Sequence, residues 1–253
     1  MSEPLLQVSH LAKRFEGIIA SDDIILNIEP GELHAVIGPN GAGKTSLILQ
    51  LSGQLRPDSG QVTFAGADIT TMPMYARAAL GLARSFQITS LFLDLSVFDN
   101  VMLAVQAKIG HSFHFWRNAR HDPALREPAM ALLERVGLAA HADRRCGDLS
   151  HGEHRLIELA MALAGSPRML LLDEPMAGLG PEESARMVSM LLALKREVTI
   201  LLVEHDMEAV FALADRISVL VYGRVIATGL PAEIRANAQV REAYLGEQEA
   251  GHV

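Results

Sequence analysis

The stretch Gly38-Pro39-Asn40-Gly41-Ala42-Gly43-Lys44-Thr45 decides the fold, because an apolar strand-like run, Leu33–Ile37, leads into it and a helix follows it. It matches the pattern G-x-x-x-x-G-K-S/T between a predicted strand and a predicted helix, which is the context that this motif requires. Glycines let backbone N–H groups surround phosphate oxygens, Lys44 neutralises charge on the β- and γ-phosphates, and the Thr45 hydroxyl can ligate Mg²⁺. The stretch therefore predicts a nucleotide-binding α/β fold, with a helix from Ser46 to about Ser52.

Two acidic residues follow a second apolar run. Met169–Leu172 is typical of a buried strand, and Asp173 and Glu174 come directly after it. In an open parallel sheet, ligands bind at the edge formed by the carboxyl ends of the strands. Asp173 therefore suits a Mg²⁺ role, and Glu174 is placed to polarise an attacking water. The alternative is an acidic pair that merely enters a loop, which the phosphate loop in the same chain disfavours.

Three further residues are candidates by their position. His205, in Val203-Glu204-His205-Asp206, follows the next apolar strand and can donate a hydrogen bond to charge developing on a γ-phosphate. Gln87, after Arg84-Ser85-Phe86, can contact both Mg²⁺ and water, and Phe15 can stack on adenine. Each has a plain alternative: a structural histidine, a solvated amide and a core aromatic ring.

The second half of the chain alternates apolar runs with helical periodicity. Runs of buried-strand type are Met169–Leu172, Thr199–Val203 and Ile217–Val221, and a helix from Pro181 to Lys195 separates the first two. Such alternation predicts right-handed βαβ units and a parallel sheet. Residues from about Ile88 to Leu163 have helical texture instead, so we expect a helical lobe inserted into a parallel-sheet core. Shorter elements are expected as strands at Leu5–Val8, Ile24–Ile28 and Val225–Ala227, and as a small helix from Pro231.

Within the helical region, Ser150 begins a helix with a capping-box pattern. Glu153 stands three residues after Ser150, apolar residues follow at helical spacing, and Gly165 is expected to end the helix as a C′ residue. Backbone N–H groups and the positive end of the helix dipole then gather at Ser150 and Gly152, as an anion site requires. Plain capping is the alternative. The phosphate loop lies elsewhere in the chain, so an anion at Ser150 would come from another molecule.

Composition limits the class of protein. The chain of 253 residues is 49% hydrophobic and 21% charged, an ordinary globular balance. Its formal charge of −8 argues against a nucleic-acid partner. Cys146 is the single cysteine, which rules out an intrachain disulfide and fits a reducing compartment. We expect no signal peptide, because the N-terminal residues lack a basic-then-apolar pattern, and no membrane-spanning segment, because the apolar runs are short.

Taken together, these motifs resemble those of the ATP-binding subunits of ABC transporters, over nearly the whole chain from Leu5 to about Gly246. The segment Leu149–Glu153 is similar to the signature segment of that family, Leu-Ser-Gly-Gly-Gln. The resemblance implies an α/β P-loop fold of ABC type, with a mainly parallel sheet, a small antiparallel part and an inserted helical subdomain. It implies one domain, 5–253, made of a core (5–86 and 165–230), a helical subdomain (87–164) and a C-terminal helix and tail (231–253).

The resemblance also implies ATP and Mg²⁺ as ligands and assigns roles to residues. Catalytic roles fall to Glu174 as the base, His205 as the switch histidine and Gln87 as the Q-loop residue, while Thr45, Gln87 and Asp173 would bind Mg²⁺. Two subunits would pair head to tail around ATP. The implied ATP-binding residues are Phe15, Gly38, Pro39, Asn40, Gly41, Ala42, Gly43, Lys44, Thr45 and Ser46 of one subunit and Ser150, Gly152 and Glu153 of the other.

Finer details resemble the LivG-type ATPases of branched-chain amino acid uptake, although urea and short-amide importers share much of them. They are Arg84–Gln87, Glu174–Gly178, Val203–Met207, the ending Arg241–Gly246 and an enlarged segment around 111–128. The chain departs from the family pattern at three positions. His151 and Glu153 replace a glycine and the glutamine of the signature, and Gly180 stands where an aspartate is common.

The resemblance implies a subunit that lies peripherally on the cytoplasmic face of the cell membrane. Its partners would be a second ATP-binding subunit (LivF-type or a second copy), two membrane-spanning permease subunits and, indirectly, an external solute-binding protein. Leu91, Phe92 and Phe98 are either a groove for a helix of the membrane partner or core of the lobe. Trp116 belongs either to an extra contact surface or to a loosely packed insertion.

Two other classes of function compete with transport. One is a soluble ABC ATPase that acts on nucleic acid or ribosomes, which usually carries a coiled-coil insertion, a second cassette or a basic arm. The other is a nucleotide sensor with little turnover, which the presence of Glu174 and His205 disfavours.

Overall fold

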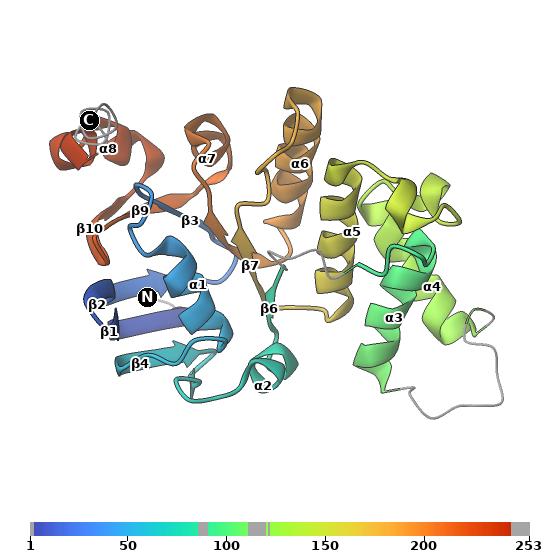
Figure 1. The fold of residues 1–253 in the computed structure, drawn as a ribbon, viewed down its shortest axis with the longest axis horizontal. Coiled ribbons are helices and arrows are strands. Elements are labelled where there is room, and N and C mark those ends of the chain that lie inside the picture. The colour runs from blue at the N-terminus through green and yellow to red at the C-terminus, as the bar shows by residue number, and fades with distance from the viewer. Residues whose placement is uncertain (1–2, 86–90, 111–119, 121, 244–253) are drawn as a thin grey trace.

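The structure is a computed structural model of the chain and describes residues 3–85, 91–110, 120 and 122–243. Within these residues the strands form two sheets, and helices cover them (Figure 1). Most of the expected functional residues lie at the loops where strands of the larger sheet end.

The larger sheet has six strands in the order β10-β9-β3-β8-β7-β6. Neighbouring strands run parallel except for the antiparallel pair β9–β10. Every residue of β3, β7 and β8 is buried, as expected for a parallel sheet that is covered on both faces. The strands are β3 (Leu33–Ile37), β6 (Leu82–Arg84), β7 (Met169–Asp173), β8 (Thr199–Val203), β9 (Arg216–Val221) and β10 (Arg224–Gly229).

The smaller sheet is antiparallel, in the order β2-β1-β4-β5. It contains β1 (Leu6–Phe15), β2 (Ile18–Ile28), β4 (Ser59–Phe64) and β5 (Ala67–Asp68). Helix α1 (Lys44–Ser52) packs Leu47, Ile48 and Leu51 into one core together with residues of both sheets. The phosphate loop, which leads into α1, therefore lies at the junction of the two sheets.

The helices α3 (Val97–Ile109), α4 (Pro123–Arg135) and α5 (His151–Ala164) pack together to one side of the sheets (Figure 1). Their core is continuous with that of the large sheet through residues such as Leu170 and Leu172. Helix α6 (Pro181–Leu194) joins β7 to β8 and also contacts α5. The remaining helices are α2 (Met74–Ala79), α7 (Met207–Leu213) and α8 (Pro231–Ala236).

The predicted parallel core, antiparallel part and inserted helices are all present, but some details were wrong or missing. The first two strands are longer than expected because they form one continuous hairpin around Gly17. Gly165 is not a left-handed C′ residue: it caps α5 with φ −69°, and the left-handed conformation falls on Ser166 with φ 49°. The elements β4, β5, β6, α2 and α7 were not predicted from the sequence.

None of the helices in the described part of the chain has the length and apolar character needed to cross a bilayer.

Candidate nucleotide-binding site

The phosphate loop is held by close backbone packing. A Cβ atom at Gly43, which has φ 103°, would collide with the carbonyl oxygen of Ala20, and one at Gly38 would collide with that of Leu220. The neighbouring turn fixes the loop further, because the N–H of Gly223 donates to the carbonyl of Ala42 over 2.8 Å. Both glycines are therefore required by the packing, and they leave the loop backbone open for close approach by phosphate.

The ammonium group of Lys44 lies in the curve of this loop. Its Nζ donates to the carbonyl oxygens of Gly38, at 2.5 Å, and Pro39, at 2.9 Å, and the residue is 7% exposed. Lys44, Thr45 and Ser46 form the first turn of α1, whose N–H groups and dipole favour an anion. Thr45 and Asn40 are exposed beside it, whereas Pro39 and Ala42 are buried. This arrangement fits the phosphate chain of a nucleotide.

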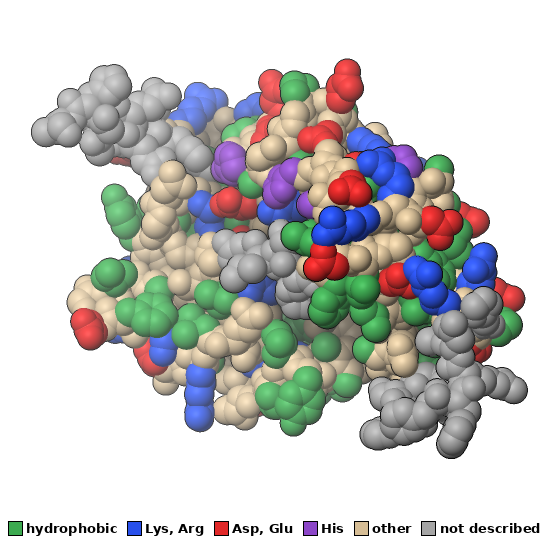
Figure 2. Space-filling view, turned by 45° about the vertical axis from the view of Figure 1, so that its right-hand side comes forward, with side chains coloured by type: hydrophobic (Ala, Val, Ile, Leu, Met, Phe, Trp, Pro, Cys, Tyr) green, Lys and Arg blue, Asp and Glu red, His purple; other side chains and the backbone are tan. Residues whose placement is uncertain are grey.

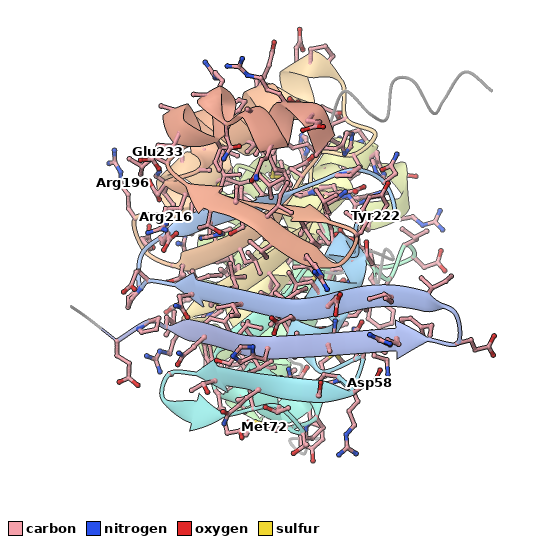
Figure 3. The ribbon with its side chains drawn as sticks, turned by 90° about the vertical axis from the view of Figure 1, so that its left-hand side faces the viewer. Asp58, Met72, Arg196, Arg216, Tyr222 and Glu233 are labelled. Carbon is pink, nitrogen blue, oxygen red and sulfur yellow. The ribbon has the colours of Figure 1, made fainter. Side chains whose placement is uncertain are left out.

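The carboxyl ends of the parallel strands face one side of the molecule. In Figure 3, Arg216 at the start of β9 and Tyr222 just past its end lie on opposite sides. Asp58 lies on the Tyr222 side and accepts a hydrogen bond from the backbone N–H of Arg14, next to Phe15. Phe15 is 44% exposed and not part of the core, with the Lys13 ammonium 5.4 Å from its ring centroid. It therefore lies on the side of the sheet that an adenine ring would approach.

Asp173 is buried at the end of β7 and pairs with Arg84. The Arg84 Nη2 atom lies 3.2 Å from Oδ2 of Asp173, and both side chains are more than nine-tenths buried. Burial raises the pKa of the Asp173 carboxyl, and the charge of Arg84 only partly offsets this. The other oxygen, Oδ1, is buried without a hydrogen-bond partner among the described residues.

These oxygens fit a hard divalent cation. An unpartnered carboxylate oxygen and an exposed threonine hydroxyl are ligands of the kind that Mg²⁺ binds alongside substrate phosphates and water. The described residues contain no group of three His, Cys, Asp or Glu side chains that would hold a metal by themselves. The donor set therefore suits a metal that arrives with a nucleotide.

Glu174 and His205 follow the neighbouring strands β7 and β8. The N–H of Glu174 donates to the carbonyl of Val203 over 2.9 Å, which joins the two loops. Glu174 has φ 50°, a left-handed conformation that is costly for a residue with a side chain. The side chain of His205 is 62% exposed. Both residues thus follow strands whose carboxyl ends lie at the same sheet edge as the phosphate loop.

Glu204 is a residue of the site to which the sequence pattern gave no role. It is fully buried, and its carboxylate accepts from the N–H groups of Met176 and His205, both over 2.9 Å. It therefore ties the loop that carries Glu174 to the loop that carries His205. The sequence signal that could have found Glu204 is an acidic residue directly after an apolar run, which is how Asp173 was predicted.

Ser150 starts α5 with the predicted capping box. Its hydroxyl accepts from the N–H of Glu153 over 3.2 Å, and the Glu153 carboxylate accepts from the N–H of Ser150 over 2.9 Å. Burial alone would raise the pKa of Glu153, but the Ser150 N–H and His141, at 2.7 Å, hold it below its usual range. Figure 1 shows α5 and α1 on opposite sides of β7, so the two helix starts do not converge within the chain.

The remaining expectations have mixed outcomes. Gln87 and Trp116 lie outside the described residues. Leu91 and Phe98 are 8% and 6% exposed and belong to the core of the helices, whereas Phe92 is 56% exposed. On the face drawn in Figure 2, hydrophobic side chains form several exposed groups, and Lys and Arg side chains are mixed with Asp and Glu.

A phosphate loop, strand-end acids at the same sheet edge and an inserted set of helices define an ATP-binding cassette. Residues 21–177 match the ABC transporter family model, and residues 224–250 match that of the branched-chain amino acid ATP-binding cassette transporter. The chain belongs to the ABC transporter family and is an ATP-hydrolysing subunit of it.

Individual relatives cover nearly the full chain. The high-affinity branched-chain amino acid transport ATP-binding protein LivG of Salmonella typhimurium is 38% identical, over 98% of this chain and 100% of its own. The lipopolysaccharide export system ATP-binding protein LptB of Acidithiobacillus ferridurans is 36% identical, over 98% and 99%. A crystal structure of an ATP-binding cassette of an ABC transporter in its ADP conformation has a TM-score of 0.86 at 28% identity, over 97% and 100%.

Proposed function

We propose that this subunit hydrolyses ATP to drive the uptake of branched-chain or related amino acids. The observation that carries the proposal is the match of residues 224–250 to the branched-chain amino acid cassette model, at the end of a chain 38% identical to LivG. Urea or short-amide import by the same type of subunit is the nearest alternative. The 36% identity to an export ATPase means that overall identity alone does not separate uptake from export, whereas the C-terminal match favours uptake.

The proposed catalytic unit is a head-to-tail dimer with two ATP molecules. Lys44 and the N–H groups of 38–46 bind the phosphates of one ATP, and Phe15 stacks on its adenine. Ser150 and Gly152 of the partner subunit then contact the terminal phosphate, with Glu153 beside them. The separation of α5 from α1 within the chain supports this arrangement, since α5 offers an anion site that its own phosphate loop does not reach.

Hydrolysis in this dimer uses groups from two strand ends. Glu174 accepts a proton from the attacking water, and His205 donates a hydrogen bond to charge that develops on the transferring phosphoryl group. Thr45, Asp173 and Gln87 are the proposed Mg²⁺ ligands, and the metal supplies charge neutralisation on the β- and γ-phosphates. ATP contacts both subunits only in the closed state, so its binding favours closure and its hydrolysis favours opening.

The proposed setting is the cytoplasmic face of the cell membrane, beside two membrane-spanning subunits and a second cassette, LivF-type or identical. A solute-binding protein outside the cell completes the system. We further propose that 87–164 forms the subdomain that couples to the membrane partner, between core segments 5–86 and 165–230 and ahead of the tail 231–253. Of the three candidate contact residues Leu91, Phe92 and Phe98, only Phe92 is exposed, so we propose that Phe92 contacts the membrane partner. The net charge of −8 supports transport over the rival soluble ATPase that acts on nucleic acid.

Substitution of the catalytic glutamate tests this mechanism. A Glu174→Gln protein should bind ATP with little change, hydrolyse it at least a hundredfold more slowly and accumulate as an ATP-bound dimer. Binding by calorimetry, phosphate release and gel filtration with ATP measure the three effects. Turnover near the wild-type rate would contradict the assignment of Glu174.

The transported solute requires the complete system. Purified with its membrane partners and solute-binding protein, the subunit should hydrolyse ATP faster in the presence of leucine, isoleucine or valine. Stimulation by urea or acetamide instead would favour the alternative importers, and stimulation by none of these solutes would count against both.

A further inference from the structure

The N-terminus of α5 is already in contact with an anion from the same chain. The hydroxyl of Ser150 donates to Oε1 of Glu183 over 2.9 Å, and the backbone N–H of Gly152 lies close enough to the same carboxylate to help lower its pKa. A Cβ atom on Gly152 would lie 2.5 Å from this Oε1, so the glycine is what allows the carboxylate so close. The two donors are those that the proposed function gives to the terminal phosphate of the partner's ATP.

We propose that Glu183 acts as an internal substitute for that phosphate, occupying the start of α5 in the single subunit and leaving it when two subunits close on ATP. The inference rests on the proposed ATP-sandwich dimer. A carboxylate and a phosphate cannot share two hydrogen-bond donors, because both are negatively charged and both need the same N–H and O–H groups. Closure must therefore displace Glu183.

The position of Glu183 suits a side chain that moves without unfolding its helix. Glu183 lies in the first turn of α6, and α6 begins directly after the segment Ala177–Gly180. Its second oxygen, Oε2, accepts from the N–H of Gly180 at 3.3 Å and so caps α6 at the same time. Rotation of the side chain away from Ser150 can keep this capping bond. The contact thus joins α6 to α5 in the single subunit and is exchanged for the nucleotide contact in the dimer.

Two neighbouring features support an electrostatic role for this contact. The hydrogen bond from Ser150 and the N–H of Gly180 hold the pKa of Glu183 below its usual range, so the side chain is ionised at neutral pH. His151 lies against the backbone of the Ala177–Gly180 segment, where a Cβ atom on Gly178 would be 3.6 Å from its ring, so this segment packs directly on the start of α5. Glu183 is therefore an ionised carboxylate at the start of α5, where the helix dipole and free N–H groups favour an anion.

The effect on closure follows from competition. An anion that must be displaced lowers the apparent affinity of the dimer for ATP and favours reopening once phosphate has left. Glu183→Gln keeps the shape and the capping of α6 but removes the charge, which weakens its bond to Ser150. The neighbouring Glu182→Gln is the matched control, because it removes the same charge from the same turn of α6 and Glu182 is exposed.

The experiment has two readouts on the full chain. In the single subunit, hydrogen exchange at the amide of Gly152 should be severalfold faster in Glu183→Gln than in Glu182→Gln. In the Glu174→Gln background, the ATP concentration for half-maximal dimer formation, measured by analytical ultracentrifugation, should fall roughly threefold to tenfold with Glu183→Gln and stay within twofold with Glu182→Gln.

The possible failures are distinguishable. Unchanged exchange at Gly152, an unchanged ATP requirement or weaker dimer formation in Glu183→Gln would each overturn the inference. Absence of any ATP-dependent dimer in the Glu174→Gln parent would instead count against the sandwich formed by two copies of this chain. In that case the exchange measurement on the single subunit still decides whether Glu183 holds the start of α5.

Discussion

At the scale of single residues, the conformation of Glu174 stands out. A left-handed backbone at a residue with a side chain costs on the order of 1–2 kcal/mol, and such strain is retained where the surrounding structure fixes it. Here the fixing groups are the buried strand β7 before Glu174 and the bond from its N–H to Val203. The strain therefore lies at the residue to which the proposed mechanism assigns the catalytic base.

Glycine usually destabilises a helix or strand relative to alanine, but the left-handed backbone of Glu174 predicts the opposite order at this position. Glu174→Gly should melt at a higher temperature than Glu174→Ala, by about 2–4 °C, because only glycine adopts φ 50° without cost. Both variants lack the carboxylate, so neither should hydrolyse ATP, and the comparison isolates the backbone. Thermal unfolding followed by circular dichroism measures the difference. Equal melting temperatures would show that the position is unstrained.

Sequence patterns gave candidates for the reacting groups but did not predict the side chains that contact and position them. Lys44 was predicted from the spacing of the phosphate-loop motif, and Asp173, Glu174 and His205 were predicted because they come directly after apolar strands. The ion pair of Arg84 with Asp173 and the contact of Glu183 with Ser150 join residues far apart in the chain, and spacing carries no information about such pairs. Gly165 was assigned a left-handed role from residue type alone, and the neighbouring Ser166 has that conformation instead.

At the scale of elements, the ends of β7 and β8 act as one unit because Glu204 bonds to both following loops. Glu204→Ala leaves the buried N–H of Met176 and the partly buried N–H of His205 without their acceptor, at a cost of roughly 2–3 kcal/mol in the free energy of unfolding. Hydrolysis should fall between about tenfold and a hundredfold, because Glu174 and His205 lose their fixed separation. Urea unfolding and phosphate release measure the two effects.

A control for this prediction is Glu208→Ala, which removes an exposed acid from the first turn of α7. It should change neither quantity appreciably. A Glu204→Ala protein with normal stability and normal turnover would show that the two loops hold their positions independently.

Helix α5 carries the buried acid Glu158, which pairs with Arg155 at 3.0 Å. Burial raises the pKa of Glu158, and the Arg155 charge only partly offsets this. A carboxyl whose pKa is raised in the folded state contributes its full stabilising effect below its ordinary value of 4.5. This effect is lost as the pH rises from 4.5 through the raised value, so the charge costs stability at neutral pH.

Glu158→Gln should therefore melt about 2–4 °C above the wild type at pH 7, which is roughly 1 kcal/mol for a chain of this length. The difference should shrink as the pH is lowered from the raised pKa toward 4.5 and stay small below 4.5, where the wild-type carboxyl is neutral in both states. Melting curves across this range measure it, with the exposed Glu134→Gln as the control. A lower melting temperature for Glu158→Gln at pH 7 would mean that the ion pair stabilises the helix.

Strands with long, continuous apolar runs were located accurately from the sequence, whereas short or polar strands were not predicted. The all-buried strands β3, β7 and β8 have continuous apolar runs and were located within a residue. Strand β6 has three residues and β5 has two, too few for any period to show. The start of β4, Ser59–Gln61, is exposed and polar, and only its pairing with β1 makes it a strand.

At the scale of the whole molecule, the proposed dimer assembles each ATP site from two chains. A Lys44→Ala chain and a Ser150→Ala chain should each be inactive as homodimers. Mixed in equal amounts, they should recover roughly a quarter of the wild-type rate, because about half of the dimers are mixed and each has one intact site. Phosphate release from the mixture measures this complementation.

The matched control mixes Lys44→Ala with Glu174→Gln. Both residues belong to the same chain's half of the site, so every mixed dimer has two broken sites and no activity should return. Recovery in this control, or none in the first mixture, would contradict the head-to-tail arrangement.

The strand order has a consequence for how the protein is made. Strand β3, which carries the phosphate loop, lies between β8 and β9, and both are encoded near the other end of the chain. A ribosome that has synthesised the whole loop and all of α3–α5 has not yet supplied either neighbour of β3. The nascent chain must then keep the apolar Leu33–Ile37 protected until Val221 emerges. The growing chain therefore acquires its complete ATP site only after β8 and then β9 have been synthesised.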